Sequence, residues 1–103
     1  MKYIMKIRFP NEKANSRLKD PKFGMKMKEI LTDVKAEAAY FTTICGDRGC
    51  YVVVNLDNAS QMAMVAEPFF HWINADIDFL PVMTPEDLEK AGPMIETAVK
   101  KWA

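Results

Sequence analysis

The residue types best suited to redox chemistry in this sequence are two cysteines, Cys45 and Cys50, separated by the stretch Gly46-Asp47-Arg48-Gly49. That stretch has the composition of a hairpin loop. Cysteines on either side of such a loop should face each other at a distance that a disulfide can span, which would permit a thiol redox sensor. A reducing cytosol favours free thiols over a disulfide. We therefore expect Cys45 and Cys50 to be reduced.

The only histidine, His71, follows the stretch Glu67-Pro68-Phe69-Phe70. Counted from Met62, the centre of the apolar face, His71 lies nine residues later in the same helix. At roughly 100° per residue it therefore points about 180° away, into solvent. Pro68 should kink this helix or break it into two short ones. Two cysteines and one outward histidine fall short of a four-ligand zinc site, so no metal site is predicted.

A third group of polar side chains, predicted to share one face of a sheet, comprises Arg8, Tyr40, Tyr51 and Asp78. They offer a cation, two phenols and a carboxylate within apolar surroundings, where burial would shift their pKa values. We take these four residues as the candidate ligand-binding site. The alternative location is the cleft between sheet and helices, where only Tyr3 and Thr43 are available for proton transfer.

The elements that position these residues follow from periodicity. Alternating apolar residues predict strands at 2–9, 38–45, 50–56 and 76–83, and helical spacing predicts helices after Asp20-Pro21, after Asp57-Asn58 and after Thr84-Pro85. Residues 11–19 are expected to be a short polar connection. The terminal helix is expected to be interrupted at Gly92-Pro93.

This order of elements predicts an α+β, ferredoxin-like βαββαβ fold, with a four-stranded antiparallel sheet, an extra C-terminal helix and a single domain spanning residues 1–103. By parity, the helix-covered face should hold Met5, Ile7, Phe9, Phe41, Val52, Val54, Ile77 and Phe79. The other face mixes apolar and polar residues, which suggests burial by a second subunit. Arg8 and Lys6 should form cross-strand ion pairs there with Asp76 or Asp78.

Charge and composition restrict the partners. Fourteen Lys and Arg balance fourteen Asp and Glu, so neither nucleic acid nor a membrane is expected as a partner. The charged N-terminus lacks the apolar run of a signal peptide or membrane span, and we expect a cytoplasmic protein. The four glycines do not form a phosphate-binding loop, and no cofactor is expected.

Several stretches together resemble a small, uncharacterised bacterial family with the dimeric α+β barrel fold: Tyr3-Ile4-Met5-Lys6-Ile7-Arg8-Phe9-Pro10, Glu37-Ala38-Ala39-Tyr40-Phe41, Ala66-Glu67-Pro68-Phe69-Phe70 and Val82-Met83-Thr84-Pro85-Glu86-Asp87-Leu88. The resemblance implies that two four-stranded sheets close into a barrel across a two-fold axis. The wider superfamily includes cofactor-free monooxygenases, muconolactone isomerase and chlorite-dismutase-like haem proteins. None of their catalytic motifs maps onto this chain, so the resemblance implies a fold and no activity.

Three hypotheses follow. The first is a homodimer, formed through the sheet face, that binds a small apolar molecule or serves as an assembly module, without clear catalytic machinery. The second is a cofactor-independent monooxygenase or isomerase acting on an aromatic or polyketide-like compound, which would need Tyr40, Tyr51 or His71 to face a water-excluding cavity. The third is the thiol redox sensor built on Cys45 and Cys50.

Overall fold

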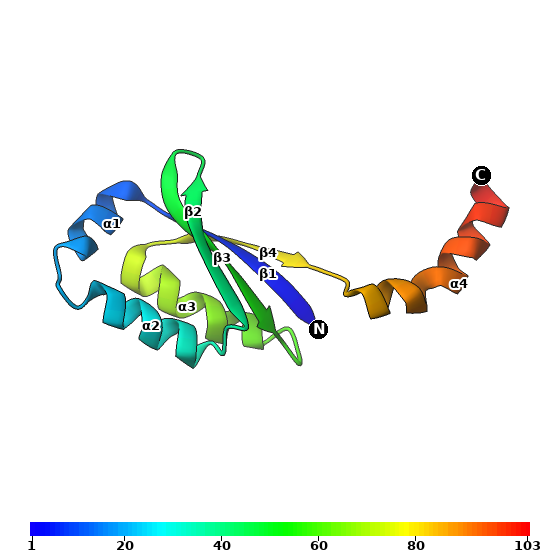
Figure 1. Cartoon of the computed structure of the whole chain (residues 1–103), viewed down its shortest axis with the longest axis horizontal. Helices are drawn as coiled ribbons and strands as arrows, with labels where there is room; N and C mark the ends of the chain where they lie inside the picture. Colours follow the sequence, from blue (N-terminus) through cyan, green and yellow to red (C-terminus); the bar gives the residue numbers. More distant parts are fainter.

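The computed structural model describes all 103 residues, as four strands and four helices (Figure 1). The elements are β1 (Lys2–Phe9), α1 (Asn11–Leu18), α2 (Phe23–Asp33), β2 (Ala38–Ile44), β3 (Asp47–Asn55), α3 (Gln61–Ile73), β4 (Asp76–Pro81) and α4 (Pro85–Trp102). The strands form one antiparallel sheet in the order β2-β3-β1-β4. This α+β arrangement is compatible with the predicted ferredoxin-like fold.

The core lies between the sheet and the helices α1, α2 and α3, which cover one of its faces (Figure 1). Every second residue of β1 points into it: Met5 and Ile7 are fully buried, and Phe9 is nearly so. From α3, Phe69 is fully buried and stacks on Phe9, with 6.5 Å between the ring centroids. The predicted helix-covered face is therefore confirmed for the central strands. On the edge strand β2, however, Phe41 is 58% exposed.

The first half of the chain contains a helix that the sequence did not predict. Residues 11–18, expected to be a connection, form α1, which buries only Ala14. Because α1 presents one small residue to the core, it lacks the apolar periodicity that predicts helices. The next helix begins at Phe23 rather than at Pro21, because the Asp20 carboxylate accepts a hydrogen bond from the Lys22 N–H in a turn before the helix.

Both prolines inside helices are accommodated without a break. Helix α3 is continuous from Gln61 to Ile73 with Pro68 inside it, so a split into two short helices is wrong. Helix α4 is likewise continuous through Gly92-Pro93, and the predicted interruption is wrong, although the helix bends near its middle (Figure 1). Proline removes one hydrogen bond and clashes with the preceding turn, which a helix can absorb by bending.

The hairpin between β2 and β3 is tighter than expected. Cys45 and Gly46 have φ values of 51° and 85° and form a two-residue turn, so the predicted four-residue loop is wrong. Positive φ at both central residues is the geometry that matches the twist of paired strands. Asp47, Arg48 and Gly49 belong to β3 and pair with residues of β2.

Helix α4 leaves the end of β4 and projects from the body of the molecule (Figure 1). Thr84 begins it with a capping box, in which its hydroxyl accepts from the Asp87 N–H and the Asp87 carboxylate accepts from the Thr84 N–H. No residue of α4 is buried. The molecule is consequently elongated, with extents of 58 × 28 × 20 Å. None of the helices combines the length and apolar composition needed to cross a membrane.

Candidate functional site

The sheet face turned away from the helices, here called the open face, carries the predicted ligand-binding residues. Strand register places Tyr40 opposite Tyr51, Tyr51 opposite Lys6, and Lys6 opposite Asp78. These four side chains form one row across all four strands. Three of the four predicted site residues, Tyr40, Tyr51 and Asp78, therefore lie in the same row, and Lys6 joins them.

Arg8 lies in the next row of the open face, where it is paired with Asp76 on one side and Gly49 on the other. Its guanidinium donates to the carboxylates of both Asp76 and Asp47. These hydrogen bonds, first the one to Asp76, raise the pKa of Arg8. The predicted cross-strand pair of Arg8 with Asp76 is confirmed. The pair with Asp47 was missed because that residue was assigned to a loop.

Gly49 leaves room on the open face that a neighbouring side chain fills. A Cβ atom at Gly49 would lie 2.6 Å from Ile44 Cδ1 and 2.6 Å from the Ile7 carbonyl oxygen, so Ile44 lies over the glycine and is 5% exposed. Beside it is a hollow of about 170 Å³, lined by Lys6, Arg8, Ile44, Cys45, Asp76 and Asp78. This end of the open face is charged.

On the other side of the tyrosine row, the next row of the open face is apolar. Register aligns Ala38, Val53, Ile4 and Leu80 in a row next to that of the two tyrosines. Tyr40 is 68% and Leu80 is 45% exposed, so no element of the same chain covers this face. The open face thus sets phenol, ammonium and carboxylate groups beside an apolar strip, an arrangement that can orient a small molecule with both apolar and polar parts.

A second hollow lies behind the sheet, between the hairpin and helices α1 and α2. It measures about 200 Å³, and its apolar lining comes from Phe9, Ala14, Leu18, Phe23, Met27 and Phe41. Arg48 is the one charged residue at this cavity, and it donates to the Asn15 side-chain oxygen over 2.8 Å. Sequence reasoning missed Arg48 because it assigned both Arg48 and the segment of Asn15 to irregular structure.

The two cysteines do not face each other. Cys50 is fully buried on the helix-covered side, opposite Phe41 and Ile7, whereas Cys45 is exposed in the turn. The predicted facing pair is wrong because the turn begins at Cys45 and β3 begins at Asp47. Burial raises the pKa of the Cys50 thiol to about 12. The geometry therefore does not support a thiol sensor built on this pair.

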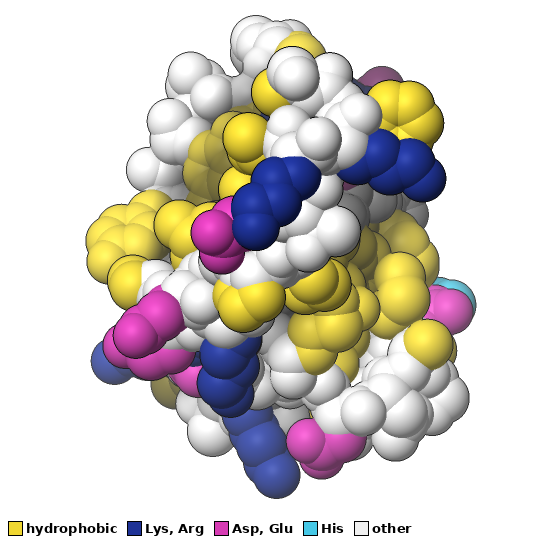
Figure 2. Space-filling view, turned by 90° about the vertical axis from the view of Figure 1, so that its right-hand side faces the viewer, with side chains coloured by type: hydrophobic (Ala, Val, Ile, Leu, Met, Phe, Trp, Pro, Cys, Tyr) yellow, Lys and Arg dark blue, Asp and Glu magenta, His cyan; other side chains and the backbone are white.

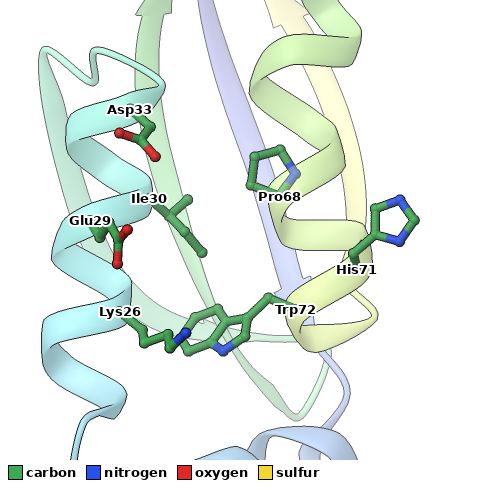
Figure 3. A pocket seen from close by; sticks show the side chains of 7 residues that line it. All are labelled: Lys26, Glu29, Ile30, Asp33, Pro68, His71 and Trp72. Carbon is green, nitrogen blue, oxygen red and sulfur yellow. The ribbon is translucent and has the colours of Figure 1, made fainter.

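His71 borders an open groove between α2 and α3 but points away from it (Figure 3). Its side chain is 82% exposed and its Nε2 lies 2.8 Å from the Glu67 carboxylate, one helical turn earlier. The predicted outward orientation is confirmed. In the groove, Trp72 stacks on Phe23 with 5.0 Å between ring centroids. His71 thus reaches no enclosed cavity, and no three His, Cys, Asp or Glu side chains gather as metal ligands would.

Comparison with curated proteins finds no match. A model of the family described as "Domain of unknown function (DUF3303)" matches residues 1–95. The match includes all four strands, and with them both faces of the sheet and the hollow behind it. The chain therefore belongs to the DUF3303 family.

Proposed function

We propose that this protein is a homodimer that binds a small, largely apolar molecule. In this dimer the open faces of two sheets meet and enclose a space between them. The observation that carries the proposal is the open face itself, where a row of Tyr40, Tyr51, Lys6 and Asp78 borders an apolar row and no helix covers either. Such a mixed surface is typical of a face that a partner covers.

In the dimer, Arg8, Tyr40, Tyr51 and Asp78 would line the enclosed space. The two phenols can donate to or accept from a polar substituent of the ligand, while Ile4, Val53 and Leu80 contact its apolar part. Arg8 has a different role, since both of its carboxylate partners come from its own chain. Arg8 holds the carboxylates of Asp47 and Asp76 in place at the charged end of the open face, and its guanidinium is not free to bind the ligand.

The hollow behind the sheet is a second candidate location for the ligand. Its lining is mostly apolar, and Arg48 at its edge would favour a ligand that carries a negative group. At about 200 Å³ it is smaller than the roughly 300–1,000 Å³ of drug-sized sites, which limits it to a ligand of about one ring.

Native mass spectrometry of the freshly purified, untagged protein tests the proposal directly. We expect a dimer that carries extra mass, and we expect that mass to disappear in the denatured spectrum of the same sample. A bare monomer would contradict both the dimer and the bound ligand. A dimer without extra mass would contradict ligand binding alone.

Two variants locate the ligand. Tyr51→Phe removes one hydroxyl from the open face, and Leu18→Trp fills the hollow behind the sheet from a position that is already 44% exposed. We expect Tyr51→Phe to lower ligand retention and Leu18→Trp to leave it unchanged. The reverse result would place the ligand behind the sheet. If the protein converts the identified ligand to a product and Tyr51→Phe abolishes that conversion, the result would favour the monooxygenase or isomerase alternative.

A further inference from the structure

Helix α4 has an apolar stripe that nothing in its own chain covers. Leu88, Ile95, Val99 and Trp102 follow one another at spacings of seven, four and three residues, and their exposed fractions are 51%, 50%, 56% and 78%. This spacing places them on one side of the helix, and the charged residues lie on the other side. Figure 2 looks at the molecule from the α4 end and shows apolar side chains lying among the charged ones.

The size of the molecule shows how much surface is uncovered. Its radius of gyration is 17.2 Å, whereas a compact domain of this length has about 13 Å. Its accessible surface is 7188 Å², compared with about 5,900 Å² for a compact protein of the same mass. The excess exceeds the roughly 800 Å² that each partner buries in a standard stable interface. The chain thus has the surface that a stable dimer needs.

Exposed apolar residues follow one another along the chain from the open face to the stripe. Leu80 lies on the open face near the end of β4, Met83 follows in the connection, and Leu88 begins the stripe; all three are 45% exposed or more. Helix α4 is 18 residues long, or roughly 27 Å, and four strands span about 15–20 Å. A helix of this length can therefore reach well onto a second copy of the chain.

From these observations we infer that α4 is an exchanged arm, which packs its apolar stripe against a second copy of this chain. The inference rests on the proposed homodimer and adds the segment that each copy contributes to the other. A two-fold dimer would bury both arms in the same way. A membrane surface fits less well, because helices that bind there carry mainly Lys and Arg, whereas the polar side of α4 also carries Glu86, Asp87, Glu89 and Glu96.

Isotope-mixed cross-linking tests whether the arm reaches the second copy. Equal amounts of unlabelled and ¹⁵N-labelled full-length protein are mixed, unfolded and refolded together, and then treated with a lysine cross-linker. We expect cross-links between Lys100 or Lys101 and lysines of the sheet, such as Lys2 and Lys6. Some of the linked peptide pairs should join a ¹⁵N-labelled peptide to an unlabelled one, which shows that the link connects two copies. A dimer whose arm links are all unmixed would overturn the exchanged arm and leave the homodimer standing. A monomer would overturn both proposals.

A matched pair of variants measures the contribution of the stripe. Ile95→Glu places a carboxylate on the apolar side of α4, and Thr97→Glu places the same group on the polar side. Because α4 buries no residue in its own chain, neither change disturbs the folded body. By sedimentation we expect the dimer dissociation constant to rise at least tenfold for Ile95→Glu and less than threefold for Thr97→Glu. Equal effects of the two variants would overturn the inference.

Discussion

At the scale of single residues, strand alternation alone placed Arg8, Tyr40, Tyr51 and Asp78 on one face, because successive side chains of a strand point to opposite sides of a sheet. The structure confirms that shared face. A ligand site there stays a proposal. The partners of these residues were harder to predict, since a pair such as Arg8 and Asp47 depends on the register of the hairpin, which a single strand pattern does not specify.

The two thiols should react at very different rates. Cys45 is exposed, whereas Cys50 is fully buried and its pKa is raised to about 12, so its reactive thiolate is scarce at pH 8. We expect one fast-reacting thiol in the native protein and two in denaturant, as counted with a chromogenic disulfide reagent. Cys45→Ser should remove the fast phase completely. Two fast thiols in the native state would contradict the buried position of Cys50.

At the scale of elements, the sequence predicted what periodicity and caps encode: the four strands, the helix-covered face and the start of α4. It failed where the local signal is ambiguous. The stretch Gly46-Asp47-Arg48-Gly49 contains two glycines that could form a turn, and the turn instead begins at Cys45, a residue type that rarely adopts positive φ. Helix α1 was missed because it buries only Ala14.

Gly49 and Gly24 should respond in opposite ways to replacement by alanine. The Gly49→Ala Cβ would lie 2.6 Å from the Ile7 carbonyl oxygen, which is backbone and cannot easily move, so we expect a loss of about 1–3 kcal/mol in the free energy of unfolding. Gly24 lies in α2 with nothing within 4 Å of such a Cβ, and its replacement should increase stability by up to about 1 kcal/mol. Urea denaturation of both variants measures the difference, and a neutral Gly49→Ala would contradict the close packing.

At the scale of the whole molecule, two uncovered surfaces dominate: the open face and the stripe of α4. The stripe of α4 could not be recognised as uncovered from sequence alone, because an amphipathic helix is equally consistent with packing on its own sheet. The mixed open face did predict a partner. The projection of α4 depends on its having no buried residue, which only the three-dimensional arrangement shows.

A chain that ends at Met83 should keep its fold. Because no residue of α4 is buried, we expect the truncated chain to retain the sheet signal in far-ultraviolet circular dichroism. At a concentration where the truncated chain is monomeric, its melting temperature should differ from that of the whole chain by only a few degrees. Small-angle X-ray scattering should give a radius of gyration near 12 Å for the truncated monomer, well below the 17.2 Å of a single full-length chain. A loss of the sheet signal would show that α4 stabilises the body.

The central position of β1 has a consequence for how the protein is made. Of the four strands in this sheet, β1 leaves the ribosome first, yet its two neighbours are β3, where Lys2 pairs with Asn55, and β4, where Tyr3 pairs with Pro81. At 5–20 residues per second, about 4 to 14 seconds pass between the synthesis of β1 and that of its last neighbour. Contacts so distant in sequence also slow folding. Until β3 and β4 follow, the nascent chain therefore exposes Met5, Ile7 and Phe9 on a strand that lacks one or both of its neighbours, and such transiently exposed apolar surface is prone to aggregation.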